Sequence, residues 1–117
     1  MASQKTYKLV TVNNAPERAK RLVGRVIEDL KDHYSIVHAG NAESPEAAKS
    51  VLEDIVPDVV FTASMWSPEQ SSQVFEAARK VNPDVKTLAI PQGLQVEKGP
   101  DAVVEFIKEQ LPVLLKA

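Results

Sequence analysis

The sequence contains no cysteine, so thiol nucleophiles, disulfide bonds and cysteine-ligated zinc sites are all excluded. Glycine is scarce as well. The 4 glycines, Gly24, Gly40, Gly93 and Gly99, are spaced too widely to form a dinucleotide-binding or phosphate-binding loop. The 2 histidines lack the spacing of a helical metal site, and we therefore expect neither a bound metal nor a cofactor.

An excess of charge of one sign and long apolar runs are also missing. The chain has 14 Lys and Arg against 16 Asp and Glu. This balance argues against binding to nucleic acids or membrane surfaces, because both require a basic excess. No segment approaches the roughly 20 apolar residues of a membrane helix, and the N-terminus has no apolar stretch typical of a signal peptide. We therefore expect a soluble, cytoplasmic protein in which residues 1–117 form a single domain.

Short apolar runs alternate with helical patterns along the chain. The runs predict buried strands over Tyr7–Val12, Tyr34–Ala39, Asp58–Ala63 and Val85–Ile90. Each run is followed by apolar residues at helical spacing, which predicts a helix after each strand. The residues expected to face inward from these helices are Ala19, Leu22, Val23, Val26, Ile27, Leu30, Ala48, Val51, Leu52, Ile55, Val74, Phe75, Ala78, Val81, Val103, Val104, Ile107 and Leu111.

Serine–proline pairs support these helix boundaries independently. Ser44-Pro45 and Ser67-Pro68 each place a capping hydroxyl before a proline at the first helical position. Gln70, three residues after Ser67, completes a capping box. The second and third helices are therefore expected to begin at these prolines.

The alternation predicts an α/β fold with three layers, in which helices cover both faces of a doubly wound parallel sheet. About four strands in the order 2-1-3-4 are expected, the flavodoxin-like arrangement, and a short fifth strand is compatible with the pattern. Residues 40–43 and Pro91–Gly99 are expected to be loops. Pro112 is expected to end or kink the last helix near Lys108–Gln110.

This strand order places a crevice at the carboxyl ends of strands one and three. The residues expected to line it, as a ligand or partner site, are Asn13, Asn14, Thr62, Ser64, Trp66 and Gln92. The two asparagines are expected to form side-chain-to-backbone hydrogen bonds and to cap the first helix. Trp66 either covers the crevice, contacts a partner, or packs against Pro68 and Pro91.

Two segments resemble the receiver domains of two-component response regulators. Lys8–Pro16, KLVTVNNAP, is similar to the family's first strand, whose acidic pair is replaced by Asn13 and Asn14. Pro57–Trp66, PDVVFTASMW, is similar to the third strand, and the phosphoacceptor position falls on Ala63. The resemblance therefore includes both strands that meet at the predicted crevice.

The resemblance extends over residues 6–91 and is weaker beyond them. Asn82–Ile90 is similar to the family's fourth strand, although the usual Thr or Ser falls on Pro91. Glu97-Lys98-Gly99-Pro100 is similar to the family's lysine motif, which makes Lys98 the counterpart of its lysine. Between these segments the chain lacks about a strand and a helix of the family pattern.

The resemblance implies a receiver fold without receiver chemistry. Phosphorylation in that family needs an aspartyl nucleophile and Mg²⁺ bound by carboxylates. Asn13 and Asn14 keep amide oxygens without charge, and Ala63 removes the nucleophile. We therefore expect a degenerate receiver, or pseudo-receiver, that is not phosphorylated on aspartate and acts in signal transduction through a protein partner.

A second class of function stays open beside this one. Asn13, Asn14, Ser64 and Gln92 could serve as neutral hydrogen-bonding groups of a small-molecule or anion-binding protein, or of an enzyme of unrecognised type. A hydrolase that uses Ser64 and His38 is disfavoured, because no G-x-S-x-G elbow surrounds the serine and no acid is placed to orient the histidine. The sequence favours a protein that is not an enzyme.

Two features suggest self-association. The C-terminal segment EQLPVLLKA has more apolar residues than one face of a small sheet needs, which predicts a homodimer through the C-terminal helix. Gly24 lies on the polar side of the first helix, where glycine is unfavourable. A close helix contact in a dimer would explain its presence.

Overall fold

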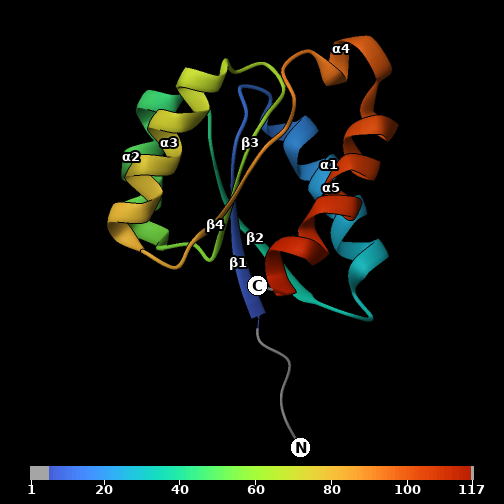
Figure 1. Ribbon diagram of the computed structural model, residues 1–117, viewed down its shortest axis with the longest axis horizontal. Coiled ribbons are helices and arrows are strands. Elements are labelled where there is room, and N and C mark those ends of the chain that lie inside the picture. Colours follow the sequence, from blue (N-terminus) through green and yellow to red (C-terminus); the bar gives the residue numbers. More distant parts are fainter. Residues whose placement is uncertain (1–5, 117) are drawn as a thin grey trace, which may run out of the picture.

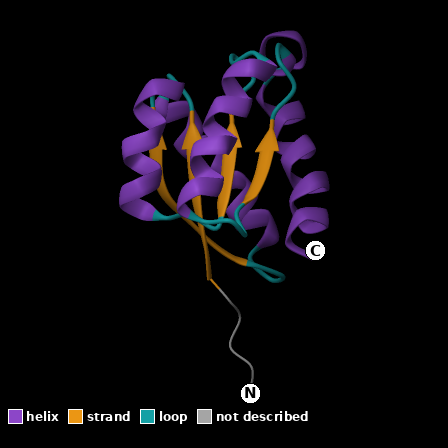
Figure 2. Cartoon of the chain, turned by 60° about the vertical axis from the view of Figure 1, so that its left-hand side comes forward, coloured by secondary structure: helices purple, strands orange, loops and turns teal. Residues whose placement is uncertain are grey.

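The computed structural model describes residues 6–116 of the chain, and these contain one parallel sheet of 4 strands. The strands are β1 (Thr6–Val12), β2 (Ser35–Ala42), β3 (Val59–Thr62) and β4 (Lys86–Ala89), in the order β2-β1-β3-β4. Figure 2 shows all the strand arrows pointing the same way between two layers of helices. The predicted flavodoxin-like arrangement is confirmed, and no fifth strand joins the sheet within residues 6–116.

Helices cover both faces of the sheet. Figure 1 shows α1 (Pro16–Leu30) and α5 (Pro100–Lys116) on one side, and α2 (Pro45–Ile55) and α3 (Pro68–Val81) on the other. The short helix α4 (Leu94–Lys98) follows β4. The start of β1 and the end of α5 lie toward the same end of the molecule (Figure 1). No helix within the described residues is long and apolar enough to cross a membrane.

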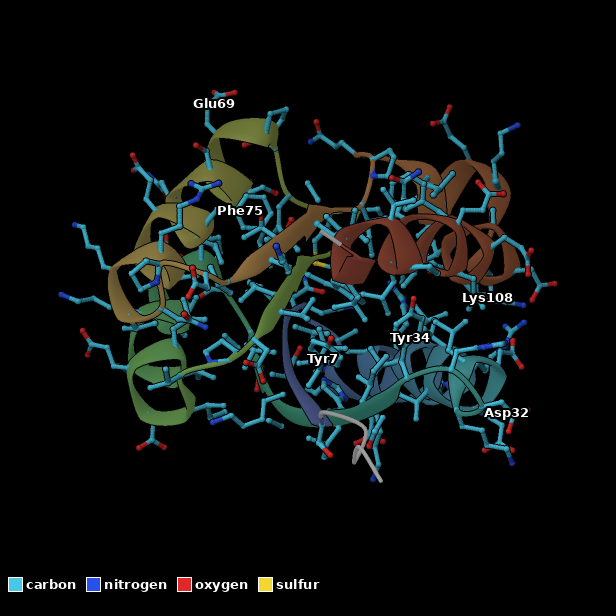
Figure 3. The ribbon with its side chains drawn as sticks, turned by 60° about the horizontal axis from the view of Figure 1, so that its bottom comes forward. Tyr7, Asp32, Tyr34, Glu69, Phe75 and Lys108 are labelled. Atoms are coloured by element: carbon cyan, nitrogen blue, oxygen red, sulfur yellow. The ribbon has the colours of Figure 1, made fainter. Side chains whose placement is uncertain are left out.

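The sheet separates two apolar cores. Leu9 and Phe61 point to the α1 and α5 side, whereas Val10 and Val60 point to the α2 and α3 side, because successive side chains of a strand face opposite ways. All the helix residues expected to face inward are buried or partly buried. Three of the larger aromatic side chains, Tyr7, Tyr34 and Phe75, pack at the edges of these cores (Figure 3).

The predicted helix starts are confirmed. Ser44 Oγ accepts a hydrogen bond from the N–H of Ala47 at 3.1 Å. Ser67 Oγ accepts from the N–H of Gln70 at 3.2 Å, and Gln70 Oε1 accepts from the N–H of Ser67 at 2.9 Å. The second pair is a complete capping box, so local sequence alone specifies the start of α3.

The predicted loop over residues 40–43 is wrong for its first three residues, because β2 continues through Ala42. Ala39 is an extra residue that bulges out of the pairing with β1, and Gly40 resumes the ladder. The N–H of Asn13 then donates to the carbonyl of Ala42 at 2.8 Å. The bulge cannot be recognised from periodicity, since it shifts the alternation by one residue.

Gly40 also allows a close contact between β2 and α2. A Cβ atom at this position would lie 2.5 Å from Cδ1 of Ile55. The missing side chain therefore lets the end of α2 pack directly on the extended part of β2.

Strands β3 and β4 are shorter than predicted. Each lacks one residue of its predicted range at either end.

In the C-terminal third, an expected loop contains a helix, and the helix end that was one of the two effects expected of Pro112 is not found. The predicted loop Pro91–Gly99 contains α4, which lies between two glycines with positive φ, Gly93 and Gly99. Pro112 does not end α5, which continues to Lys116. Leu114 and Leu115 pack against the apolar core beyond the proline, and this packing outweighs the hydrogen bond that proline removes.

Candidate functional site

The loop after β1 is organised by Asn13. This side chain is 5% exposed, and its Oδ1 accepts a hydrogen bond from the N–H of Ala15 at 2.8 Å. Its backbone carbonyl accepts from Nδ2 of Asn41 at 3.0 Å. The amide of Asn13 is therefore used to fix the turn, as expected for an asparagine that bonds its own backbone two residues on.

Asn14 differs from its neighbour in exposure and in contacts. Its side chain is exposed, and its N–H points at Sδ of Met65 at 3.4 Å. The helix cap expected from the asparagine pair is not found, because α1 begins after Ala15 without a side-chain cap. Pro16 at the start of α1 lacks an N–H, which leaves one fewer backbone donor to satisfy.

Trp66 connects the end of β3 to the end of β1. Its Nε1 donates to the carbonyl of Val12 at 2.7 Å, and its ring packs against the apolar core beneath α2 and α3. The same carbonyl accepts the N–H of Ala63 at 3.1 Å. The ring is partly buried within the chain, which gives Trp66 a structural role. Its predicted roles as a lid or as a partner contact, and its packing on Pro68 and Pro91, stay predictions.

The other predicted residues of β3 are also engaged within the chain. The hydroxyls of Thr62 and Ser71 lie 2.7 Å apart, and both side chains are buried. The carbonyl of Ser64 accepts the N–H of Gly93 at 2.9 Å, and its hydroxyl lies 3.4 Å from the N–H of Gln95. Ser64 therefore anchors the segment that leads from β4 into α4.

Two small cavities of about 20 Å³ each lie between these loops and α1. Both are lined by Asn13, Leu22, Ala63 and Ile90. Each has room for about one water molecule. The space beside Ala63, at the position of the family's phosphoacceptor, is therefore small in the folded chain.

The polar groups around the second cavity carry no negative charge. It is lined by Arg18, Ser64 and Gln95 in addition to the shared residues, and Gln95 Oε1 is buried without a hydrogen-bond partner among the described residues. No Asp or Glu lines either cavity. Within residues 6–116 no group of three His, Asp or Glu side chains could bind a metal ion. A divalent cation beside Arg18 would be repelled and would find only neutral oxygens.

Five predicted site residues do not line these cavities, namely Asn14, Thr62, Trp66, Gln92 and Lys98. Gln92 is exposed in the turn before α4, and Lys98 is exposed at the end of α4. Arg18 and Gln95 line the second cavity and were not predicted. Arg18 lies about one helical turn after the Asn13 loop, and this spacing could have indicated that it lines the site. Gln95 reaches the cavity only because α4 forms.

A polar chain links β2 to the same loop. Asn41 donates to the carbonyl of Asn13, so its Oδ1 is free to accept the hydroxyl of Thr11 at 2.6 Å. Because that hydroxyl has a single hydrogen, Thr11 must in turn accept from Nε2 of His38 at 2.8 Å. Burial lowers the pKa of His38 below its ordinary value of 6.5. His38 therefore donates from Nε2 to this chain of hydrogen bonds, and it is not paired with Ser64.

The fold has clear relatives among solved structures. The chain is similar to the signal receiver domain of the response regulator NarL from Mycobacterium tuberculosis, with 18% identity and a TM-score of 0.61 over 92% of this chain and 98% of that one. The chain has the receiver fold. It is also similar to the isolated receiver domain of RcsB from Salmonella enterica serovar Typhimurium, with 11% identity and a TM-score of 0.52 over 88% of this chain and 72% of that one. No protein-family model matches the chain, and no curated protein matches its sequence.

Proposed function

We propose that this chain is a non-catalytic, receiver-like regulatory module that is not phosphorylated on aspartate and acts by contact with proteins. Two observations support the proposal: alanine stands at position 63, and the cavity beside it is small. An alanine cannot accept a phosphoryl group, and the cavity beside it has a volume of about 20 Å³. We further propose that residues 1–117 form one pseudo-receiver domain and that the protein acts in the cytoplasm.

The electrostatics of the site support the same proposal. Phosphoryl transfer from a small donor requires Mg²⁺ to neutralise the charge of the phosphate oxygens, and Mg²⁺ binds through carboxylates. The amide of Asn13 is committed to the N–H of Ala15, and Arg18 supplies the charge that lines the cavity. Lys98, the family-lysine counterpart, is exposed and does not line it.

The test is direct phosphorylation. The purified protein is incubated with Mg²⁺ and acetyl phosphate, and its intact mass is measured under neutral conditions. We expect no added phosphoryl group, because the nucleophile is absent. A receiver domain that has all three acidic residues, treated in parallel, establishes that the donor is active. A stoichiometric adduct on this chain would contradict the proposal.

A gain-of-function variant sharpens the test. The triple substitution N13D/N14D/A63D restores the acidic residues at the positions where the resemblance expects them. Circular dichroism first establishes that the variant is folded, since Asn13 and Ala63 are both buried. A phosphoryl adduct on the triple variant alone would support the view that these three positions account for the lost chemistry.

The second class, a small-molecule or anion-binding protein or an unrecognised enzyme, has less support. Asn13 and Ser64, two of its four proposed ligand groups, already bond to backbone groups of the chain. NMR titration with phosphate, a sugar or a nucleotide separates the two classes. Chemical shifts confined to residues 13–16 and 62–67 would favour a binding protein.

Self-association belongs to the same proposal. The C-terminal helix predicted to mediate it packs against α1, and its Leu114 and Leu115 are partly buried in the core. Val113, which is 65% exposed, is the large apolar residue that this segment leaves at the surface. The surface of the neighbouring helix α1 offers a more specific contact.

A further inference from the structure

The solvent-facing side of α1 forms one charged stripe. Six residues at helical spacing form it, and all of them are exposed: Glu17, Lys20, Arg21, Gly24, Glu28 and Lys31. An open hollow lies over the stripe, centred on Gly24. The opposite side of the helix, which includes Leu22 and Val26, is buried in the core. The stripe is therefore free for contact with another molecule.

Gly24 has no role inside the chain that would require glycine. It lies in the middle of a regular helix, and a Cβ atom there would meet nothing within 4 Å. Glycine is among the least favourable residues for a helix interior. Its advantage is that a second backbone can approach closely at this point, as small residues allow at helix–helix contacts.

The charges at the edge of α1 and those on the stripe differ in their partners. At the edge, Arg25 pairs with Asp101 of α5 at 2.9 Å, and Asp29 pairs with Lys108 of α5 at 3.1 Å. These two ion pairs connect α1 with α5. On the stripe, Glu17, Lys20 and Arg21 make no ion pair with any of residues 6–116.

The stripe is complementary to itself about Gly24. Lys20 lies four residues before the glycine and Glu28 four residues after it, or about 6 Å to either side along the helix axis. Glu17 and Lys31 lie seven residues before and after it. If a second copy is turned by 180°, each of these charges meets the opposite sign, whereas a parallel copy would place like charges together.

We propose that α1 is a self-association surface on which two copies pack antiparallel, with Gly24 against Gly24. Lys20 of each copy then faces Glu28 of the other, and Glu17 faces Lys31, as a two-fold interface requires. In this dimer Glu28 keeps its contact with Lys31 of the same copy at 2.7 Å. Both side chains are more than half exposed, so each can also reach a residue of the other copy. The inference rests on the proposed protein-contact function and names its partner as a second copy of this chain.

The contact belongs to the weak class of interfaces. One 15-residue helix from each copy buries well under the roughly 1,200 Å² of a standard interface. Exposed ion pairs are screened by salt, so association is strongest at low ionic strength. Sedimentation equilibrium up to millimolar protein, at low and at high salt, measures the dissociation constant of the full chain.

Charge reversal tests the geometry. Lys20→Glu and Glu28→Lys each place like charges at two symmetric positions, and each is expected to weaken association roughly tenfold. The double variant K20E/E28K restores opposite charges and is expected to recover the affinity of the wild type. Lys49→Glu, the same charge change on exposed α2, is the matched control and leaves the affinity unchanged.

The outcomes separate this surface from its alternatives. Concentration-dependent amide shifts within residues 17–31 support it, and circular dichroism establishes that each variant is folded. A wild type that stays monomeric at low salt, a double variant that does not recover, or shifts confined to the end of α5 around Val113 would overturn it. Failure here leaves the acetyl phosphate result untouched, since that measurement records the mass of the single chain whether or not two copies associate.

Discussion

Trp66 Nε1 and the backbone oxygen of Val12 are joined by a hydrogen bond of 2.7 Å. The N–H of Ala63 donates to the same oxygen, so one carbonyl at the end of β1 accepts two bonds from the segment after β3. Trp66 is the sole tryptophan of the chain, and its fluorescence therefore reports on this junction. The junction lies beside the cavity lined by Ala63.

Replacing Trp66 by Phe removes one of these two bonds and keeps an aromatic ring. We expect the free energy of unfolding to fall by about 1–2 kcal/mol, because a hydrogen bond and part of the packed ring are lost. Urea denaturation followed by far-UV circular dichroism measures it. An unchanged unfolding midpoint would mean that the indole bond contributes nothing to the junction.

The same substitution at two glycines should have opposite effects. A Cβ meets nothing within 4 Å at Gly24 or at Gly99, so sterics do not distinguish them. Gly24→Ala should stabilise the chain by about 1 kcal/mol, because alanine favours the helix. Gly99→Ala should destabilise it by roughly 1–3 kcal/mol, because φ is +85° there. Thermal unfolding of both variants provides the comparison, and shifts of the same sign would refute the backbone explanation.

Val56 has an unfavourable backbone conformation for a β-branched residue. It ends α2 with φ of 53° and is 41% exposed. Val56→Gly should raise the free energy of unfolding by about 1 kcal/mol, since glycine adopts this conformation without a penalty. Val96→Gly, at a valine inside α4 that is 89% exposed, is the matched control and should lower it. Chemical denaturation measures both.

His38 should make stability depend on pH. Burial lowers its pKa in the folded chain, so the unfolded chain binds the proton more readily. The free energy of unfolding is therefore expected to fall as the pH decreases through the ordinary value of 6.5, and to level off below the lowered folded pKa. Urea titrations between about pH 8 and pH 5 measure the slope. The variant His38→Gln should lose the part of the slope that His38 supplies, and an identical slope would contradict the assignment.

Much of the fold follows from local pattern. Short apolar runs predict the four strands, and apolar residues at helical spacing predict the inward faces of the helices, because burial of apolar surface dominates the folding free energy. Ser44 and Ser67 specify helix starts through bonds within three residues. The strand order is the flavodoxin-like one expected for a doubly wound sheet with right-handed connections.

The remaining features depend on contacts far apart in sequence. The bulge at Ala39 exists because β2 must stay paired with β1 up to Ala42. Helix α5 continues past Pro112 because Leu114 and Leu115 have a core to pack against. Gln95 lines the cavity only because α4 forms, and the chain of hydrogen bonds from His38 to Asn13 requires β1 and β2 to pair. None of these has a signal in a single window of sequence.

Strand β1 begins at Thr6 and helix α5 ends at Lys116, and Figure 1 shows both points toward one end of the molecule. The loops that contain Asn13 and Ser64 lie at the opposite end of the molecule, at the carboxyl ends of the parallel strands. A fluorescent protein or an affinity tag joined at either end is therefore placed away from those loops. Because both points lie toward the same end of the molecule, insertion of the domain into a host loop is also expected to leave the cavity region accessible.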